Sequence, residues 1–205
     1  QYDVFGNFSR AITPNGTPSP HLQWDPTEQE IFDAITDKRL DEEPMATIPE
    51  GMTARAFAAQ VARERLRSAV PDVDTYCDAE INDSMYFTLF PNFHPWGAFN
   101  RINYRFRPVG TKVDECLMEC IYTEDFEGDE RPAPAEYIEL GIDQEWTELI
   151  PVIGNLARVF HQDSFNLPKV QKGLETFRAD GLTLTKYQEV KIRHWHAMAE
   201  RFIAN

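Results

Sequence analysis

The sequence lacks a long apolar run and any excess of positive charge. No segment approaches the ~20 apolar residues of a membrane-spanning helix, and none resembles the apolar region of a secretory signal. The 205 residues carry 20 basic and 34 acidic side chains, which gives a net charge of −14. Such a chain repels nucleic-acid backbones and anionic membranes. We therefore expect neither nucleic acid nor a membrane among its partners.

The sequence also has few cysteines, and it lacks two glycine-containing motifs that are common in enzymes. The three cysteines, Cys77, Cys116 and Cys120, form no C-x-x-C pair, and their odd number does not suit a disulfide framework. This usage predicts a reducing compartment, the cytoplasm. There is no G-x-S-x-G nucleophile motif and no phosphate-binding glycine loop. The sequence therefore does not support nucleophilic catalysis or phosphate binding by a glycine loop.

What the chain has is aromatic content, with 14 Phe, 7 Tyr and 4 Trp. Its length suits one domain, 1–205. Asp25 is expected to cap a helix, with Pro26 in the first helical position and Glu28 closing a capping box. The other predicted segments of the first 84 residues are an opening loop, an acidic linker, a second helix and a further loop, at 1–22, 41–51, 53–68 and 71–83.

A sheet is predicted next. Residues 85–93 are aromatic and β-branched enough for a buried strand, and 101–107 and 113–121 alternate between apolar and polar residues. A hairpin folded about Gly110 satisfies both faces of the last two segments in one register. The expected pairs are Arg105 with Glu115, Arg101 with Glu119, Tyr104 with Cys116 and Ile102 with Met118.

The last third has helical periodicity. One apolar stripe comprises Leu156, Phe160, Leu167, Val170, Leu174 and Phe177. After Gly181 a final helix is expected to bury Ile192, Trp195, Ala199 and Phe202. Strands followed by two long helices predict an α+β domain, an antiparallel β-sheet with long C-terminal helices packed on it.

Asp163 interrupts the longer stripe. Its phase between Phe160 and Leu167 places the carboxylate on the apolar face, where an unpaired charge would cost several kcal/mol. It would need a cation, a hydrogen-bond network or a metal there. A half-exposed carboxylate, or one paired with Arg158, is the alternative interpretation. Pro168 cannot donate to the preceding turn, so the helix is expected to kink or restart there.

Several segments resemble, in order, the C-terminal part of Rieske non-haem iron ring-hydroxylating oxygenase α subunits. The similarity spans 85–205, while 1–84 matches loosely. The segments are Leu89-Phe90-Pro91-Asn92, Arg105-x-Arg107-Pro108-Val109-Gly110, Val159-Phe160-His161-Gln162-Asp163-Ser164-Phe165-Asn166, Val170-Gln171-Lys172-Gly173-Leu174, Glu189 and Trp195-His196.

The resemblance implies a helix-grip (Bet v1-like, SRPBCC) fold and a dioxygen-using oxidoreductase. Asp163 would be the carboxylate of a 2-His-1-carboxylate site for mononuclear Fe(II). Leu156, Val159 and Phe160 would line the pocket for an aromatic or similarly apolar substrate. Electrons would come from a reductase, with or without a ferredoxin, through a Rieske [2Fe-2S] cluster. The family further implies a homotrimer, and in some members a β subunit.

The same resemblance shows what this sequence does not contain. The two iron histidines and the C-x-H and C-x-x-H cluster motifs are expected upstream of Gln1. The chain is then either a fragment of a protein about twice as long or a remnant that keeps the fold without the chemistry. A second hypothesis follows from the smaller helix-grip proteins, which only bind apolar ligands: a non-catalytic binding module with Asp163 as a polar anchor.

The histidines offer one alternative set of metal ligands. His161-x-Asp163 resembles the H-x-D of 2-oxoglutarate oxygenases, with His194 or His196 as a distal partner. On a helix, however, residues two apart point away from each other. His196 is expected in the core, His194 on the surface and His94 in a loop.

Overall fold

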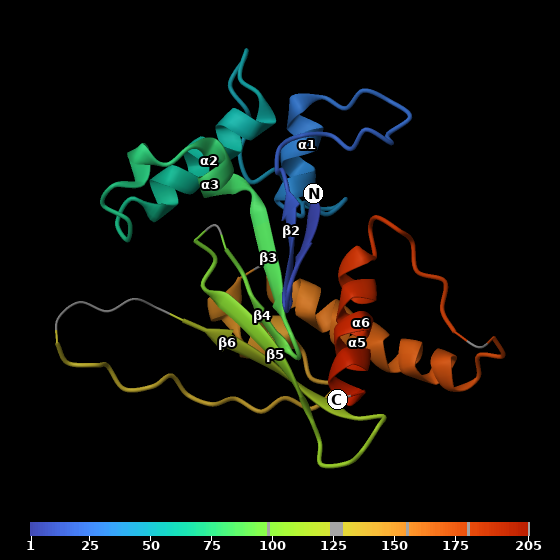
Figure 1. Cartoon of the computed structure of the whole chain (residues 1–205). Coiled ribbons are helices and arrows are strands. Elements are labelled where there is room, and N and C mark those ends of the chain that lie inside the picture. Colours follow the sequence, from blue (N-terminus) through green and yellow to red (C-terminus); the bar gives the residue numbers. More distant parts are fainter. Residues whose placement is uncertain (98, 124–128, 155, 180, 205) are drawn as a thin grey trace. The chain divides into compact units, whose positions relative to one another are not determined.

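The computed structural model describes residues 1–97, 99–123, 129–154, 156–179 and 181–204. The chain folds into two compact units. The first consists of Gln1–Asn100 together with Tyr187–Asn205, and the second of Arg101–Lys186. Figure 1 shows both units and labels most of their helices and strands.

Four antiparallel strands follow one another across the first unit: β1 (Tyr2–Phe5), β2 (Phe8–Thr13), β3 (Ser84–Leu89) and β4 (Phe93–Pro95). The prediction of a loop over 1–22 was therefore wrong for its first half. Ser9 and Ala11 alternate inward on β2 and are fully buried. The strand predicted over 85–93 instead ends at Leu89, and the chain turns around Pro91, which has no N–H for a sheet hydrogen bond.

The helices of the first unit are α1 (Glu28–Ile35), α2 (Ala54–Leu66), the short α3 (Asp78–Asn82), the 3₁₀ turn Val73–Thr75 and α6 (Val190–Ile203). Thr53 caps α2 and confirms the second predicted helix. The predicted loop 71–83 contains the 3₁₀ turn and α3.

The capping box of α1 differs from the prediction. It joins Thr27 to Glu30 rather than Asp25 to Glu28: the Thr27 hydroxyl accepts from the backbone N–H of Glu30, and the Thr27 N–H donates to the Glu30 carboxylate at 2.7 Å. These two side chains satisfy the backbone N–H groups of Glu30 and Thr27, and this reciprocal pair defines the cap more strongly than a preceding aspartate and proline.

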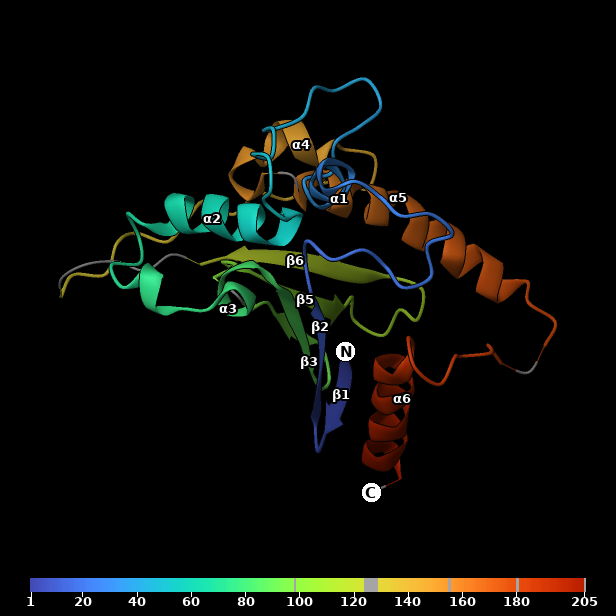
Figure 2. The ribbon, with the colours of Figure 1, turned by 90° about the horizontal axis from the view of Figure 1, so that it is seen from above.

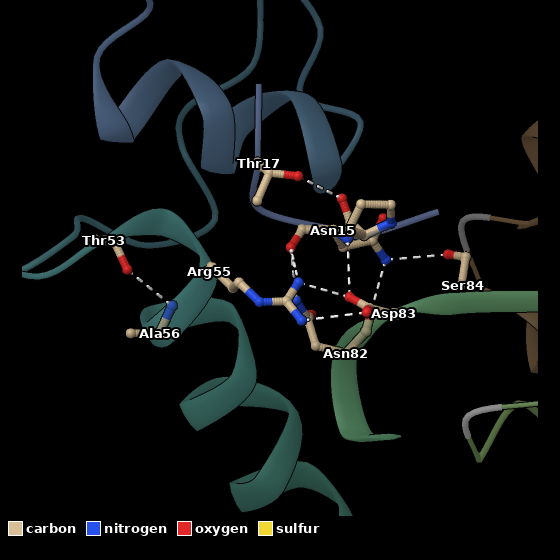
Figure 3. Close-up of polar contacts among 9 residues, drawn as sticks. Asn15, Thr17, Thr53, Arg55, Ala56, Asn82, Asp83 and Ser84 are labelled. Atoms are coloured by element: carbon tan, nitrogen blue, oxygen red, sulfur yellow. Dashed lines mark hydrogen bonds and ion pairs between the residues drawn. The ribbon is translucent and has the colours of Figure 1, made fainter. Parts of the chain in front are cut away.

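A buried ion pair joins α2 to the start of β3. Arg55 donates to both carboxylate oxygens of Asp83, at 2.6 and 3.2 Å, and to the carbonyl of Asn15 at 2.8 Å (Figure 3). The Asn15 amide in turn bonds the carbonyl of Asn82 and the hydroxyl of Ser84. Side-chain hydrogen bonds thus fix the loop after β2 against α2 and β3.

The face that α6 buries is not the one its apolar residues predicted. The helix lies beside β1, as Figures 1 and 2 both show, and also contacts β2. It buries Met198 and half-buries Lys191 and His194, whereas Ile192 and Phe202 are exposed. Two residues of the apolar stripe contact the turn after β3 instead. Trp195 and Phe202 contact the ring of Phe90, and the Trp195 indole donates to the Pro91 carbonyl at 2.6 Å.

The second unit begins with the predicted hairpin, β5 (Ile102–Pro108) and β6 (Cys116–Tyr122). The hairpin is confirmed, but its register was predicted wrongly by four residues. Arg105 faces Glu119, Tyr104 faces Cys120, Phe106 faces Met118 and Ile102 faces Tyr122. The cause is a longer loop, 109–115, in place of a tight turn about Gly110. A shift by an even number keeps every side chain on its predicted face.

The core of the second unit gathers on the hairpin. After α4 (Trp146–Leu149) and the 3₁₀ turn Pro151–Ile153, α5 (Leu156–Glu175) begins, with α4 at its N-terminal end (Figure 2). Its first turns bury side chains against β5 and β6. The buried cluster is Ile102, Trp146, Ile153, Ala157 and Phe160. The helix continues through Pro168 without restarting. In the second half of α5, Leu167, Val170 and Leu174 are exposed, contrary to the predicted buried stripe.

The architecture agrees with the predicted class. The protein is α+β, its strands pair antiparallel, and each long C-terminal helix packs on strands of its own unit, an arrangement consistent with a helix-grip-like fold. All three cysteines are free thiols. Within the described residues, no helix has both the length and the apolar character needed to cross a membrane.

Candidate functional site

The predicted site residues lie on the first turns of α5. Phe160 is buried, with its ring centroid 5.5 Å from that of Trp146 and 6.1 Å from that of Tyr104. Leu156 is half-buried against the same cluster, whereas 43% of Val159 is exposed. Two of the three predicted pocket residues therefore pack with the aromatic core, and the third faces outward.

Asp163 is exposed rather than buried on the apolar face. The helix packs through Ala157 and Phe160, and six residues at 3.6 per turn place Asp163 roughly 120° around the helix from Ala157. Atoms of its neighbours still remove part of its water, and this desolvation raises the pKa of the carboxyl. No hydrogen bond or ion pair reaches it from the described residues. The side chain is thus an unneutralised carboxylate at the border of the packed part of α5.

His161 is engaged in another direction. Its Nε2 lies 3.1 Å from a carboxylate oxygen of Glu145, the residue that caps α4 and accepts from the Thr147 hydroxyl at 2.9 Å. The His161 Nδ1 atom is buried and has no hydrogen-bond partner in the described part of the chain. The contact joins α5 to α4, and the His161-x-Asp163 spacing provides no second ligand beside the aspartate.

A metal would need more ligands than this segment offers. Among the residues that the structure describes, no three His, Cys, Asp or Glu side chains are grouped closely enough to hold an ion. Of the facial set that the sequence suggested, only the carboxylate of Asp163 is present here. The residues that the structure describes therefore do not form a complete iron site by themselves.

The remaining histidines depart from expectation in both directions. His196 is exposed, not in the core. His194, predicted to be exposed, is half-buried, with Nε2 3.2 Å from the Gly6 carbonyl oxygen. Both differences follow from the rotation of the buried face of α6 described above. His94, predicted in a loop, lies on strand β4.

Sequence reasoning missed a second group of polar side chains, which centres on His94 and Lys191. The His94 Nδ1 lies 3.2 Å from the Thr88 hydroxyl, and Lys191 of α6 reaches Tyr86 on the same strand as Thr88. The signal that could have found them is the alternation of Tyr86 and Thr88 along one strand, which places both side chains on one face.

Searches with this chain against family models, against curated proteins and against solved structures each found no match.

Proposed function

We propose that this chain is the C-terminal part of the catalytic domain of a Rieske-type ring-hydroxylating oxygenase, in which Asp163 supplies the carboxylate ligand of mononuclear Fe(II). The observation that carries the proposal is the state of this side chain. It is a carboxylate on a regular helix, exposed, and without a partner among the described residues. It is thereby available to a cation presented by another segment. The ordered motifs from Leu89 to His196 supply the family.

The roles of the chain's own residues follow from their packing. Phe160 anchors the helix in the aromatic cluster and so fixes the position of Asp163 less than one turn later. Leu156 and Val159, in the helix turn that precedes this anchor, would contact an aromatic or similarly apolar substrate. When bound, Fe(II) would supply open coordination positions for dioxygen.

The rest of the proposal is drawn from the resemblance. The two histidines and the Rieske [2Fe-2S] cluster would belong to an upstream part of the same protein. Electrons would arrive from a ferredoxin or a reductase. A trimer in the cytoplasm is the proposed working form, in keeping with the free thiols.

The test compares Asp163→Asn with Glu175→Gln in the protein expressed from its full coding sequence. Glu175 is an exposed carboxylate at the end of the same helix and serves as a matched control. We expect the Asp163 variant to lose the mononuclear iron and substrate oxidation, while the visible spectrum of the cluster persists. The control should keep all three. An Asp163 variant with full iron content and turnover would refute the assignment.

A second candidate, the apolar-ligand-binding module, is favoured by one observation: the exposed apolar side chains Leu167, Val170 and Leu174 on the second half of α5. The coding sequence upstream of Gln1 separates the two hypotheses. An upstream region without paired histidines or the C-x-H and C-x-x-H motifs, in a protein purified without iron, would favour the module and end the enzyme proposal.

A further inference from the structure

A buried polar group lies on the face of the first unit's sheet that α6 covers. Ser9 of β2 pairs with Thr88 of β3, and paired residues of antiparallel strands share a face. Thr88 contacts His94 of β4 through its hydroxyl, at 3.2 Å. Three neighbouring strands thus each present one polar side chain on the same face.

Aromatic rings continue this face toward the other end of the strands. Tyr86, two residues before Thr88, forms an antiparallel bridge with Trp96, and their ring centroids lie 5.5 Å apart. From α6, Lys191 places its ammonium nitrogen 4.6 Å from the Tyr86 ring centroid and donates to the Tyr86 carbonyl at 3.4 Å. The group therefore combines one cation, three polar side chains and two aromatic planes.

Two members of this group have an unmet hydrogen-bonding capacity. Ser9 is completely buried, yet its hydroxyl has no hydrogen-bond partner among the described residues, and the buried indole N–H of Trp96 has none there either. A buried polar atom without a partner costs about 1–3 kcal/mol, so native proteins rarely keep one unless water or another molecule satisfies it. Both atoms are able to donate a hydrogen bond, and a donor is satisfied by an acceptor.

The charge of the group is also uncompensated. Lys191 is half-buried, and no described carboxylate pairs with it; its contacts are the ring and the carbonyl of Tyr86. Burial lowers the pKa of Lys191 to about 8, so the ammonium form still predominates at pH 7. Burial, with a smaller contribution from Lys191, lowers the pKa of His94 to about 4, so that ring is neutral at the same pH. Within this group of side chains the net charge is therefore one positive charge, that of Lys191.

We propose that this face binds a small monocarboxylate, held by the Lys191 ammonium and by the Ser9 hydroxyl and the Trp96 indole N–H. One half-buried cation matches one anionic charge, whereas a dianion would bring a second charge without a partner. A carboxylate has two oxygens and about four acceptor positions, which suits an ammonium and two neutral donors. The Tyr86 and Trp96 rings offer planar apolar surfaces to the body of the ligand, which favours an aromatic acid over acetate.

The four tryptophans make this site measurable by NMR. Each indole N–H of Trp24, Trp96, Trp146 and Trp195 gives its own ¹H–¹⁵N signal, and a Trp96→Phe variant assigns the second of them. Sodium benzoate and sodium acetate are titrated at constant ionic strength, with sodium chloride as the balancing salt. We expect a saturable shift of the Trp96 signal, at lower concentration with benzoate. Trp195, whose indole already donates to Pro91, should move little.

Variants decide whether the proposed donors cause the shift. Lys191→Met keeps the apolar stem but removes the charge, and we expect the dissociation constant for benzoate to rise about tenfold or more, since hydrogen bonds to charged groups are the strong ones. Lys172→Met, an exposed lysine of α5, is the matched control and should bind as the unmodified protein does. Ser9→Ala tests the hydroxyl independently, with an expected loss of several-fold, should the Lys191 variant fold poorly.

Two results would overturn the proposal. One is a Trp96 signal that moves no more with benzoate than with chloride, which would mean that water satisfies these donors. The other is unchanged benzoate affinity in folded Lys191 and Ser9 variants. Because Asp163 takes no part in this site, neither result bears on the iron proposal.

Discussion

Two arginine–aspartate pairs in the first unit have nearly the same geometry and differ in burial. Arg55 contacts Asp83 at 2.6 and 3.2 Å, and Arg67 contacts Asp74 at 2.6 and 3.1 Å. The Asp83 side chain is 7% exposed and that of Arg55 26%, against 64% for Asp74 and 49% for Arg67. The pairs therefore separate the effect of burial from that of distance.

We predict that Asp83→Ala lowers the free energy of unfolding by about 3 kcal/mol, the lower end of the range for breaking a buried pair, because Arg55 keeps some contact with water. The substitution also leaves the backbone N–H of Asn15 without its acceptor, the Asp83 carboxylate at 3.2 Å. Asp74→Ala should have a much smaller effect, because water solvates both partners after the pair is broken.

Urea unfolding followed by far-UV circular dichroism measures both variants, and Arg55→Met with the double variant completes a mutant cycle. The Arg55→Met change should restore part of the stability lost in Asp83→Ala, because it removes the uncompensated charge. Equal losses for Asp83→Ala and Asp74→Ala would refute the reasoning, since distance alone would then determine the contribution.

Three further predictions concern single-residue properties: the pKa of Glu119, the backbone of two glycines and the burial of Cys120. Hydrogen bonds from Arg107 and Arg105 lower the pKa of Glu119 to about 2. The contribution of Glu119 to the stability of the fold is therefore complete above about pH 4.5 and is lost as the pH falls toward 2. The melting temperature of Glu119→Gln should fall less between these pH values than that of the unmodified protein. Gly110→Ala should lower the free energy of unfolding by about 1 kcal/mol, because Gly110 has a positive φ and open space around it. Gly16→Ala should lower it more, because the added Cβ would also lie 2.5 Å from a backbone atom of Arg55. Denaturant midpoints measure both effects. Burial raises the pKa of Cys120 to about 11, so mass spectrometry should find it alkylated by iodoacetamide at pH 8 much more slowly than exposed Cys116.

The sequence predicted the sheet face of each side chain better than it predicted which residues pair across the strands. On β5 and β6 the alternation assigned every side chain to its side, but two registers four residues apart satisfy that alternation equally. One-to-one pairing of charges favoured the wrong register. In the structure Glu119 instead takes both Arg105 and Arg107, at 2.6 and 2.7 Å, which a rule of single pairs does not anticipate.

The first hairpin was predictable and was missed. Two residues, Gly6 and Asn7, separate β1 from β2, and a Gly-Asn pair between two alternating segments is a recognised hairpin signal. The prolines and the polar residues that follow gave the whole region the composition of a loop. Composition averaged over about twenty residues thus concealed a local pattern six residues long.

The candidate site was harder to predict because an apolar stripe shows only which residues share a side of a helix. On α5 only the first part of the stripe is buried and Asp163 is exposed, and on α6 the half-buried Lys191 lies on the side that faces the strands. The difference between the two charges is one of side-chain length. An aspartate carboxylate stays close to its backbone, so it can carry a charge only where the helix surface is near water or a cation. A lysine can bury its stem and carry its ammonium to a neighbouring strand, here to the Tyr86 carbonyl. The partners of such a lysine lie on another element far along the chain, so its chemistry emerges only when the strands opposite it are known.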